Sequence, residues 1–301
     1  MLSADEAKRD AYFAAAERKY EREMAQVFRD ALDDIRAEMA KVYDKYAANG
    51  VLTKAQMTRY NRLATLEKNI IAIMKPVVAK AKGMVNRLKP VEYGEAFWRT
   101  AWAFDNETGV GLSWGTLDKN AIAANLSNVF HKVALKNWST EALGRVRTAI
   151  SNGLAIGQSY PAMMRDMKAY INAENFKIMR ILRTELHDAQ EAGTAAGYKA
   201  ALDMGIDGKV IWLASLDGRT RPDHAAMDGK ARDDDGKFRG AIGEAQYPGW
   251  EGLPASERIN CRCTMRFEVE GFPPLVRRSR EDGIIPYQTY TDWRADRRLF
   301  A

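Results

Sequence analysis

Two neighbouring stretches decide the fold of this chain: WLASLDGRTRPDHAAMDGK (residues 212–230) and QYPGWEGLPASERINCRCT (residues 246–264). They contain one of the three histidines, His224, and both cysteines, Cys261 and Cys263. The cysteines begin the segment CRCTMRFEVE, which alternates with the period of two that is typical of a β-strand. Because residues i and i+2 of a strand point to the same face, we expect both thiols to project together.

This trio allows three interpretations. The first is a zinc site, for which a fourth ligand such as Asp217 or Asp223 would have to be recruited. The second is a nucleophilic site in which His224 activates a thiolate, although no nucleophile-elbow motif accompanies it. The third treats the thiols as small buried hydrophobes and His224 as a residue that pins a loop to the sheet. We favour the third and expect no cofactor, because polar residues in Gly-rich turns more often brace than react.

The bracing interpretation predicts a network of charge-assisted hydrogen bonds around the histidine. Carboxylates and guanidinium groups that lie close together in the loop can hold it without any catalysis. The expected members of this structural network are Asp217, Arg219, Arg221, Asp223 and His224.

The order of residues in this region resembles the Mu F-type domain of the minor head proteins of tailed bacteriophages, the head-morphogenesis family. The resemblance extends from about Ile178 to Glu270, and an ordered match of many elements is more specific than one short motif. The matching elements are Asp217, Arg219-Thr220-Arg221-Pro222-x-His224, Met227-Asp228-Gly229, Phe238, Pro248-Gly249 and Asn260-Cys261-Arg262-Cys263.

The resemblance implies a low-copy protein of the phage head that acts in capsid assembly, near the portal and the packaged DNA, without established enzymatic activity. The expected partners are the portal protein, the major capsid protein or both. The expected location is the virion, in the capsid interior or at the portal vertex, after synthesis in the host cytoplasm. The alternative is an enzyme, or an effector injected with the DNA, that uses His224 with Cys261 and Cys263.

Composition is consistent with a soluble protein of more than one domain. With 301 residues, 46% of them hydrophobic, the chain can bury substantial cores. It has no apolar run of the roughly 18 residues that a spanning helix needs, and the segment MLSADEAKRD lacks a signal-peptide hydrophobic region. We therefore expect no membrane association.

The net charge of +6 is unevenly distributed, because residues 53–89 carry nine basic residues and one acidic residue, Glu67. Such a surface would face packaged double-stranded DNA non-specifically or an acidic partner, since Lys and Arg neutralise phosphates without reading sequence. The alternative is the solvated face of a basic amphipathic helix. The candidate residues are Lys54, Arg59, Arg62, Lys68, Lys75, Lys80, Lys82, Arg87 and Lys89.

Periodicity predicts a long antiparallel helical hairpin over residues 1–89. No Pro or Gly interrupts the chain between the capping box at Ser3 and Asn49-Gly50, and Phe28, Leu32, Ile35, Met39, Val42 and Tyr46 follow heptad spacing. A second helix should begin at Thr53, with an opposing stripe from Tyr60 to Leu88, and Pro76 should kink or split it.

Three further regions complete the predicted α+β architecture. Residues 90–172 should form an aromatic connector, up to Gly115, followed by helices. Residues 173–270 should form a small α+β module with a short antiparallel sheet from strands near residues 210–215, 237–238 and 264–269. Residues 271–301, rich in Pro and Arg, should form an extended basic arm. We expect this arm to dock a partner through Arg277, Arg278, Arg280, Tyr287, Tyr290, Trp293 and Phe300.

Overall fold

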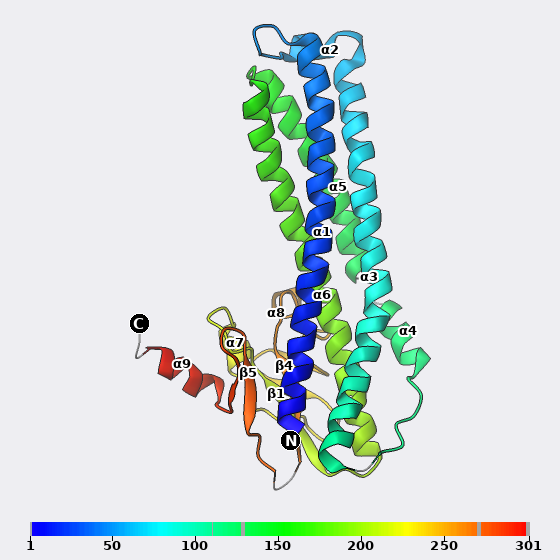
Figure 1. The fold of residues 1–301 in the computed structure, drawn as a ribbon, viewed down its shortest axis with the longest axis vertical. Coiled ribbons are helices and arrows are strands. Elements are labelled where there is room, and N and C mark those ends of the chain that lie inside the picture. Colours follow the sequence, from blue (N-terminus) through cyan, green and yellow to red (C-terminus); the bar gives the residue numbers. More distant parts are fainter. Residues whose placement is uncertain (1, 110, 128–129, 270–271, 299–301) are drawn as a thin grey trace. The chain divides into compact units, whose positions relative to one another are not determined.

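A computed structural model describes residues 2–109, 111–127, 130–269 and 272–298 of the chain. Long packed helices come first, and short two-stranded antiparallel sheets follow towards the C-terminus (Figure 1). The predicted α+β class with a mostly helical N-terminal part is therefore confirmed. In the described part of the chain, no helix combines the length and apolar character that crossing a bilayer requires.

The chain divides into two compact units that are not contiguous in sequence. A helical unit comprises residues 18–85 and 129–182, and a mixed unit comprises residues 1–17, 86–128 and 183–301. The long helices Leu2–Tyr46, Arg62–Thr108 and Tyr160–Asp203 each contribute segments to both units, so this division differs from the four consecutive regions that the sequence suggested.

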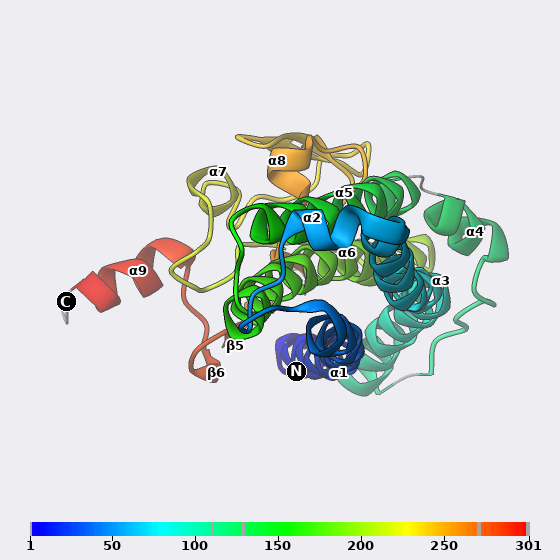
Figure 2. The ribbon, with the colours of Figure 1, turned by 90° about the horizontal axis from the view of Figure 1, so that it is seen from above.

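The helical unit contains segments of four long helices that run side by side (Figures 1 and 2). They belong to α1 (Leu2–Tyr46), α3 (Arg62–Thr108), α5 (Phe130–Ala155) and α6 (Tyr160–Asp203). The predicted seam of α1 is buried at Phe28, Leu32, Ile35 and Met39, as is the stripe of α3 at Ile70, Met74, Val77 and Met84. Polar contacts accompany this apolar packing, since Asn69 Nδ2 donates to Glu38 at 2.9 Å and Lys80 pairs with Glu23 at 2.7 Å.

The turn between α1 and α3 departs from the predicted single second helix. The capping box at Thr53 is present, but it opens only the short α2 (Lys54–Thr58), which is followed by the 3-10 turn η1 (Arg59–Asn61). Tyr60 and Asn61 adopt positive φ angles of 56° and 55°, which interrupt the helix. Tyr60 is consequently 82% exposed, so its assignment to the apolar stripe was wrong.

Helix α3 continues without a break through Pro76 and Pro90 to Thr108. Of the kink or split predicted at Pro76, the split is therefore excluded, and the prediction of a connector beginning at Pro90 was wrong. The aromatic side chains of Tyr93, Phe97 and Phe104 are buried at helical spacing. Packing of this apolar stripe outweighs the helix-breaking tendency of proline, which costs about 3 kcal/mol in a helix interior.

The mixed unit contains three short sheets in its described residues. Strands β1 (Gly208–Leu213) and β4 (Thr264–Val269) pair antiparallel, from Gly208 opposite Val269 to Leu213 opposite Thr264. The second sheet pairs β2 (Phe238–Gly240) with β3 (Gly243–Ala245). The third pairs β5 (Val276–Ser279) with β6 (Gly283–Pro286). The strands predicted near residues 210–215, 237–238 and 264–269 are thus present with small shifts.

Two close approaches fix the core of the mixed unit. A Cβ added at Gly193 of α6 would lie 2.2 Å from the backbone carbonyl oxygen of Tyr93, so glycine lets α3 and α6 approach each other closely. The buried guanidinium of Arg9, from the first turns of α1, donates to the Tyr198 hydroxyl and to the carbonyl of Met265, at 3.0 Å each. The start of α1 is thereby bonded to α6 and β4.

Lys89 differs from the other residues of the predicted basic surface because it is completely buried. Its Nζ lies 3.0 Å from Glu185 and 3.3 Å from Asp188, both buried residues of α6. The assignment of Lys89 to a DNA-facing surface was therefore wrong, since its charge is matched inside the protein.

The expected extended arm is folded in its described residues, 272–298. It forms the β5–β6 hairpin and helix α9 (Tyr290–Arg298), and Phe300 lies outside the described residues. Arg277 is buried and donates to Asp228 at 2.7 Å, and Tyr290 and Trp293 are buried in the core of the mixed unit. These three side chains anchor the segment to its own unit, whereas Arg278 and Tyr287 are half-buried and Arg280 is exposed.

Candidate functional site

The loop that follows β1 leads into α7 (Pro222–Ala225), a single helical turn that carries His224. Pro222 favours this turn because its fixed φ suits the first helical position. His224 is 2% exposed, and Trp212 of β1 meets its ring edge-on with a centroid distance of 6.2 Å. The imidazole is therefore held against the sheet.

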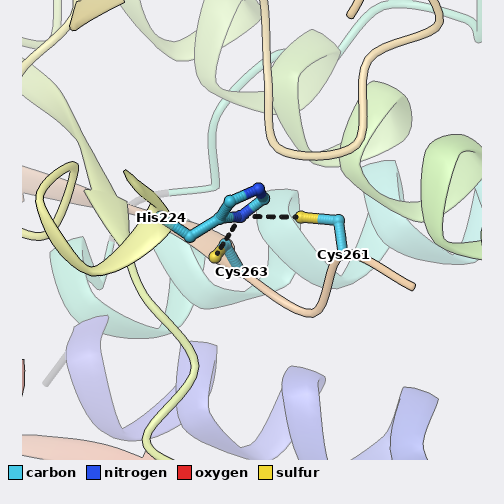
Figure 3. Close-up of side chains that lie close together, drawn as sticks. All are labelled: His224, Cys261 and Cys263. Atoms are coloured by element: carbon cyan, nitrogen blue, oxygen red, sulfur yellow. Dashed lines mark hydrogen bonds between the residues drawn. The ribbon is translucent and has the colours of Figure 1, made fainter. Parts of the chain in front are cut away.

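A second loop, between α8 (Ala255–Arg258) and β4, carries both cysteines. Asn260 adopts a positive φ of 56°, which turns the chain before Cys261. Both thiols are buried, and His224 Nδ1 lies 3.3 Å from Cys263 Sγ and 3.7 Å from Cys261 Sγ (Figure 3). The cysteines precede the strand, which begins at Thr264, yet both thiols approach the histidine as the sequence suggested.

The opposite edge of the imidazole contacts polar side chains. His224 Nε2 lies 3.1 Å from Glu257 Oε2 and 3.1 Å from a guanidinium nitrogen of Arg221. Arg221 also donates to the carbonyl of Ile259 at 3.0 Å and to the carbonyl of Glu257 at 2.6 Å. Arg221 thus joins the histidine loop to the cysteine loop.

Asp217 joins the same two loops by a bidentate ion pair. Arg262, which lies between the two cysteines, donates to Asp217 at 2.9 and 2.8 Å, and the backbone N–H of Arg219 donates at 2.9 Å. Burial of the Asp217 carboxyl opposes its ionisation, but the hydrogen bonds and charge of Arg262 and the hydrogen bonds from Arg219 and Ser215 together lower its pKa below the ordinary value. The carboxylate form of Asp217 is therefore the one that stabilises the fold.

Only some of the residues predicted for the structural network take part in it. Asp217, Arg221 and His224 take part through their side chains, whereas Arg219 contributes its backbone and Asp223 is exposed. Sequence reasoning missed two members, Glu257 and Arg262. Arg262 could have been found from its place inside the Asn-Cys-Arg-Cys motif, but no local pattern marked Glu257.

A pocket of about 190 Å³ opens between the two loops. Its lining includes His224, both cysteines and the arginines Arg219, Arg221 and Arg262. Burial and a hydrogen bond to Cys263 raise the pKa of the Cys261 thiol. Burial also opposes ionisation of Cys263, but its hydrogen bonds with Cys261 and His224 lower the pKa of this thiol below the ordinary value.

Of the two remaining histidines, His187 lies beside the cysteine loop, where it hydrogen-bonds the backbone of Cys263. His187 is buried in α6, where burial and the charge of Arg262 lower its pKa to about 4, so it is neutral at physiological pH. The side chain of His131 lies outside the described residues, although its backbone belongs to α5.

The β1–β4 sheet, the histidine loop and the Asn-Cys-Arg-Cys loop together define a phage Mu F-like module. The family described as "Phage Mu protein F like protein" matches residues 144–266, which include β1, both loops and the first half of β4. The chain also aligns with the minor head protein GP7 of Bacillus phage SPP1, at 30% identity over 91% of each chain. The chain therefore belongs to the phage Mu F-like family of minor head proteins.

A second relative is named for a different function. The chain is 28% identical to an NAD(+)--arginine ADP-ribosyltransferase, EFV, of Enterococcus faecalis, over 90% of this chain and 56% of that protein. The match leaves a large part of the transferase without a counterpart in this chain. No solved structure shows significant similarity to the chain.

The Asp217–Arg262 ion pair predicts the effect of removing one charge. Asp217→Asn should lower the free energy of unfolding at neutral pH by about 1.5–3 kcal/mol, as expected for a hydrogen-bonded charge. Because the folded-state pKa of Asp217 lies below its unfolded value, this contribution is present above the unfolded pKa of about 3.9 and is lost as the pH falls. The difference between the variant and the wild type should therefore shrink in acid.

Chemical denaturation at pH 7 and at about pH 2.5, below the unfolded pKa, measures both effects. The matched control is Asp223→Asn, which changes an exposed aspartate of the same loop and should cost less than about 0.5 kcal/mol. Equal stability of the two variants at pH 7 would contradict a bracing role for Asp217.

Proposed function

We propose that this protein is a structural minor head component that acts in the assembly of a tailed-bacteriophage head, near the portal and the packaged DNA. The observation that carries the proposal is the similarity to a minor head protein along 91% of both chains. On this proposal the protein resides in the virion, in the capsid interior or at the portal vertex, after synthesis in the host cytoplasm. Its partners are the portal protein, the major capsid protein or both.

The helical unit supports a contact with DNA through exposed basic residues. Lys68, Lys75 and Lys82 are exposed on α3 and recur every seven residues, which places them along one face of the helix. Lys54 and Arg59 are exposed at the turn that precedes α3. A row of cations of this kind attracts phosphates without reading base sequence.

The remaining predicted basic residues are less available for such a contact. Arg62 is half-buried, with its guanidinium carbon 3.8 Å from the ring centroid of Tyr46, and Lys80 pairs with Glu23. Arg87 is exposed but belongs to the mixed unit, and Lys89 is buried. The proposed DNA-facing surface therefore consists of Lys54, Arg59, Lys68, Lys75 and Lys82.

The assembly role predicts association with large head proteins. The purified chain should cosediment with purified portal protein, with major capsid protein or with both, and should stay in the supernatant when centrifuged alone. If it stays in the supernatant with each of these proteins and with their mixture, the assembly role is wrong.

The DNA contact predicts a loss of affinity on charge reversal. Binding to random duplex DNA should weaken with salt, and Lys75→Glu with Lys82→Glu should reduce the log-log salt slope by about 1.8, from about 0.9 per lost phosphate contact. The control Arg165→Glu with Lys168→Glu makes the same charge change at exposed positions of α6 and should lower affinity much less. Filter binding or fluorescence anisotropy across a salt series measures both, and undetectable binding at low salt would rule out the DNA contact.

The alternative function is an enzyme or co-injected effector that uses His224 with Cys261 or Cys263. One observation favours it, the similarity to a protein named as an ADP-ribosyltransferase. The site itself offers a thiol that ionises readily beside an imidazole, which is a nucleophile arrangement. Turnover of NAD⁺ that disappears in His224→Ala, while the melting temperature holds, would establish this alternative.

A further inference from the structure

Three soft donor atoms converge in the pocket between the histidine loop and the cysteine loop. His224 Nδ1, Cys261 Sγ and Cys263 Sγ all lie within 4.8 Å of one another, and Nδ1 lies 3.3 and 3.7 Å from the two sulfurs (Figure 3). In tetrahedral zinc sites, Zn–S bonds of about 2.3 Å and Zn–N bonds of about 2.0 Å place neighbouring ligand atoms about 3.5–3.8 Å apart. The observed spacing suits one ion at the centre of the three atoms.

The second nitrogen of the imidazole is placed as in known metal sites. Nε2 lies 3.1 Å from the carboxylate of Glu257, which can accept the Nε2 proton. Arg221 also lies 3.1 Å from Nε2 but has no acceptor, so Glu257 is the partner that takes the Nε2 proton when an ion binds the lone pair of Nδ1. Nδ1 faces both sulfurs. A carboxylate behind a ligating histidine fixes the orientation of the ring and increases the basicity of the ligand.

The pocket gives an ion access to the three donor atoms and leaves room for a fourth ligand. All three donor residues line it, so an ion can enter and a water molecule can complete the tetrahedron. Each cysteine thiol releases its proton on binding, and the two resulting thiolates balance the two positive charges of the ion.

We propose that His224, Cys261 and Cys263 bind one zinc ion, with a water molecule from the pocket as the fourth ligand. The bracing interpretation favoured from the sequence accounts for Asp217, Arg221 and Arg262, but it does not require Nδ1 to face two sulfurs. Soft thiolates with one imidazole select zinc over magnesium or calcium, which prefer oxygen ligands. Glu257 is a positioning residue that holds His224 for the ion.

Metal content of the whole chain tests the proposal. The protein, without an affinity tag and purified under reducing conditions, should contain about one zinc ion per chain by elemental analysis. Cys261→Ser, Cys263→Ser and His224→Ala should each lower the zinc content to less than about a tenth, because each removes a ligand. His131→Ala, which changes a histidine of α5 in the helical unit, should keep the full content.

A cobalt titration keeps the test decisive if a variant fails to fold. Wild-type protein freed of metal by a chelator should develop a thiolate-to-cobalt charge-transfer absorption band that saturates at one Co²⁺ per chain, and zinc should displace it. The absence of zinc in the purified wild type, together with the absence of this band, would overturn the proposal and leave the three residues as packing groups.

The role of Glu257 is tested by affinity. Glu257→Gln should weaken zinc binding by about 10–100-fold, because it removes the carboxylate behind the ligating histidine. The control Glu251→Gln changes an exposed glutamate of the same loop region and should leave the affinity unchanged. Equal affinities for both variants would contradict the positioning role of Glu257.

Discussion

A buried cluster of two cations and two anions is the constraint on which the mixed unit depends. Lys89 of α3 and Arg258 of α8 share the carboxylates of Glu185 and Asp188 of α6, at distances from 2.9 to 3.9 Å, and all four side chains are at least 98% buried. An unpaired buried charge costs several kcal/mol. Burial of any one of these four side chains is therefore unfavourable unless the helices that carry the opposite charges pack beside it. The charges of the cluster are therefore paired only when α3, α6 and α8 pack together.

The same cluster positions the candidate site. Arg258 lies at the end of α8, one residue after Glu257 and three residues before Cys261. Because Arg258 is held by Glu185, the cysteine loop starts from a fixed point, and the Asp217–Arg262 and Arg221 contacts then bind it to the histidine loop. A zinc ion at His224 would add a third tie between these loops. This rigidity suits a protein that serves as a structural part of an assembly.

The sequence predicted those features whose cause is local. Strand β4 follows from the alternation in residues 264–269, and the approach of the thiols to His224 follows from the motif. Prediction from the sequence failed where residues distant in the chain determine the environment of a side chain. Lys89 was assigned to a basic surface because its partner Glu185 is 96 residues away. Likewise, α3 continues past Pro90 because its aromatic residues pack in the core. Arg277, Tyr290 and Trp293 suggested a docking arm because their partners in the mixed unit are invisible to local patterns.

The central claim, that the buried charge cluster holds the mixed unit together, is tested most directly by comparing Lys89→Met with Lys80→Met in denaturant unfolding. Both change a lysine of α3 to methionine, but Lys80 forms a half-exposed pair with Glu23. Lys89→Met should cost about 3–5 kcal/mol, because it leaves two buried carboxylates with Arg258 as their one remaining cation in this cluster. Lys80→Met should cost less than about 1 kcal/mol. Equal losses in the two variants would contradict the account.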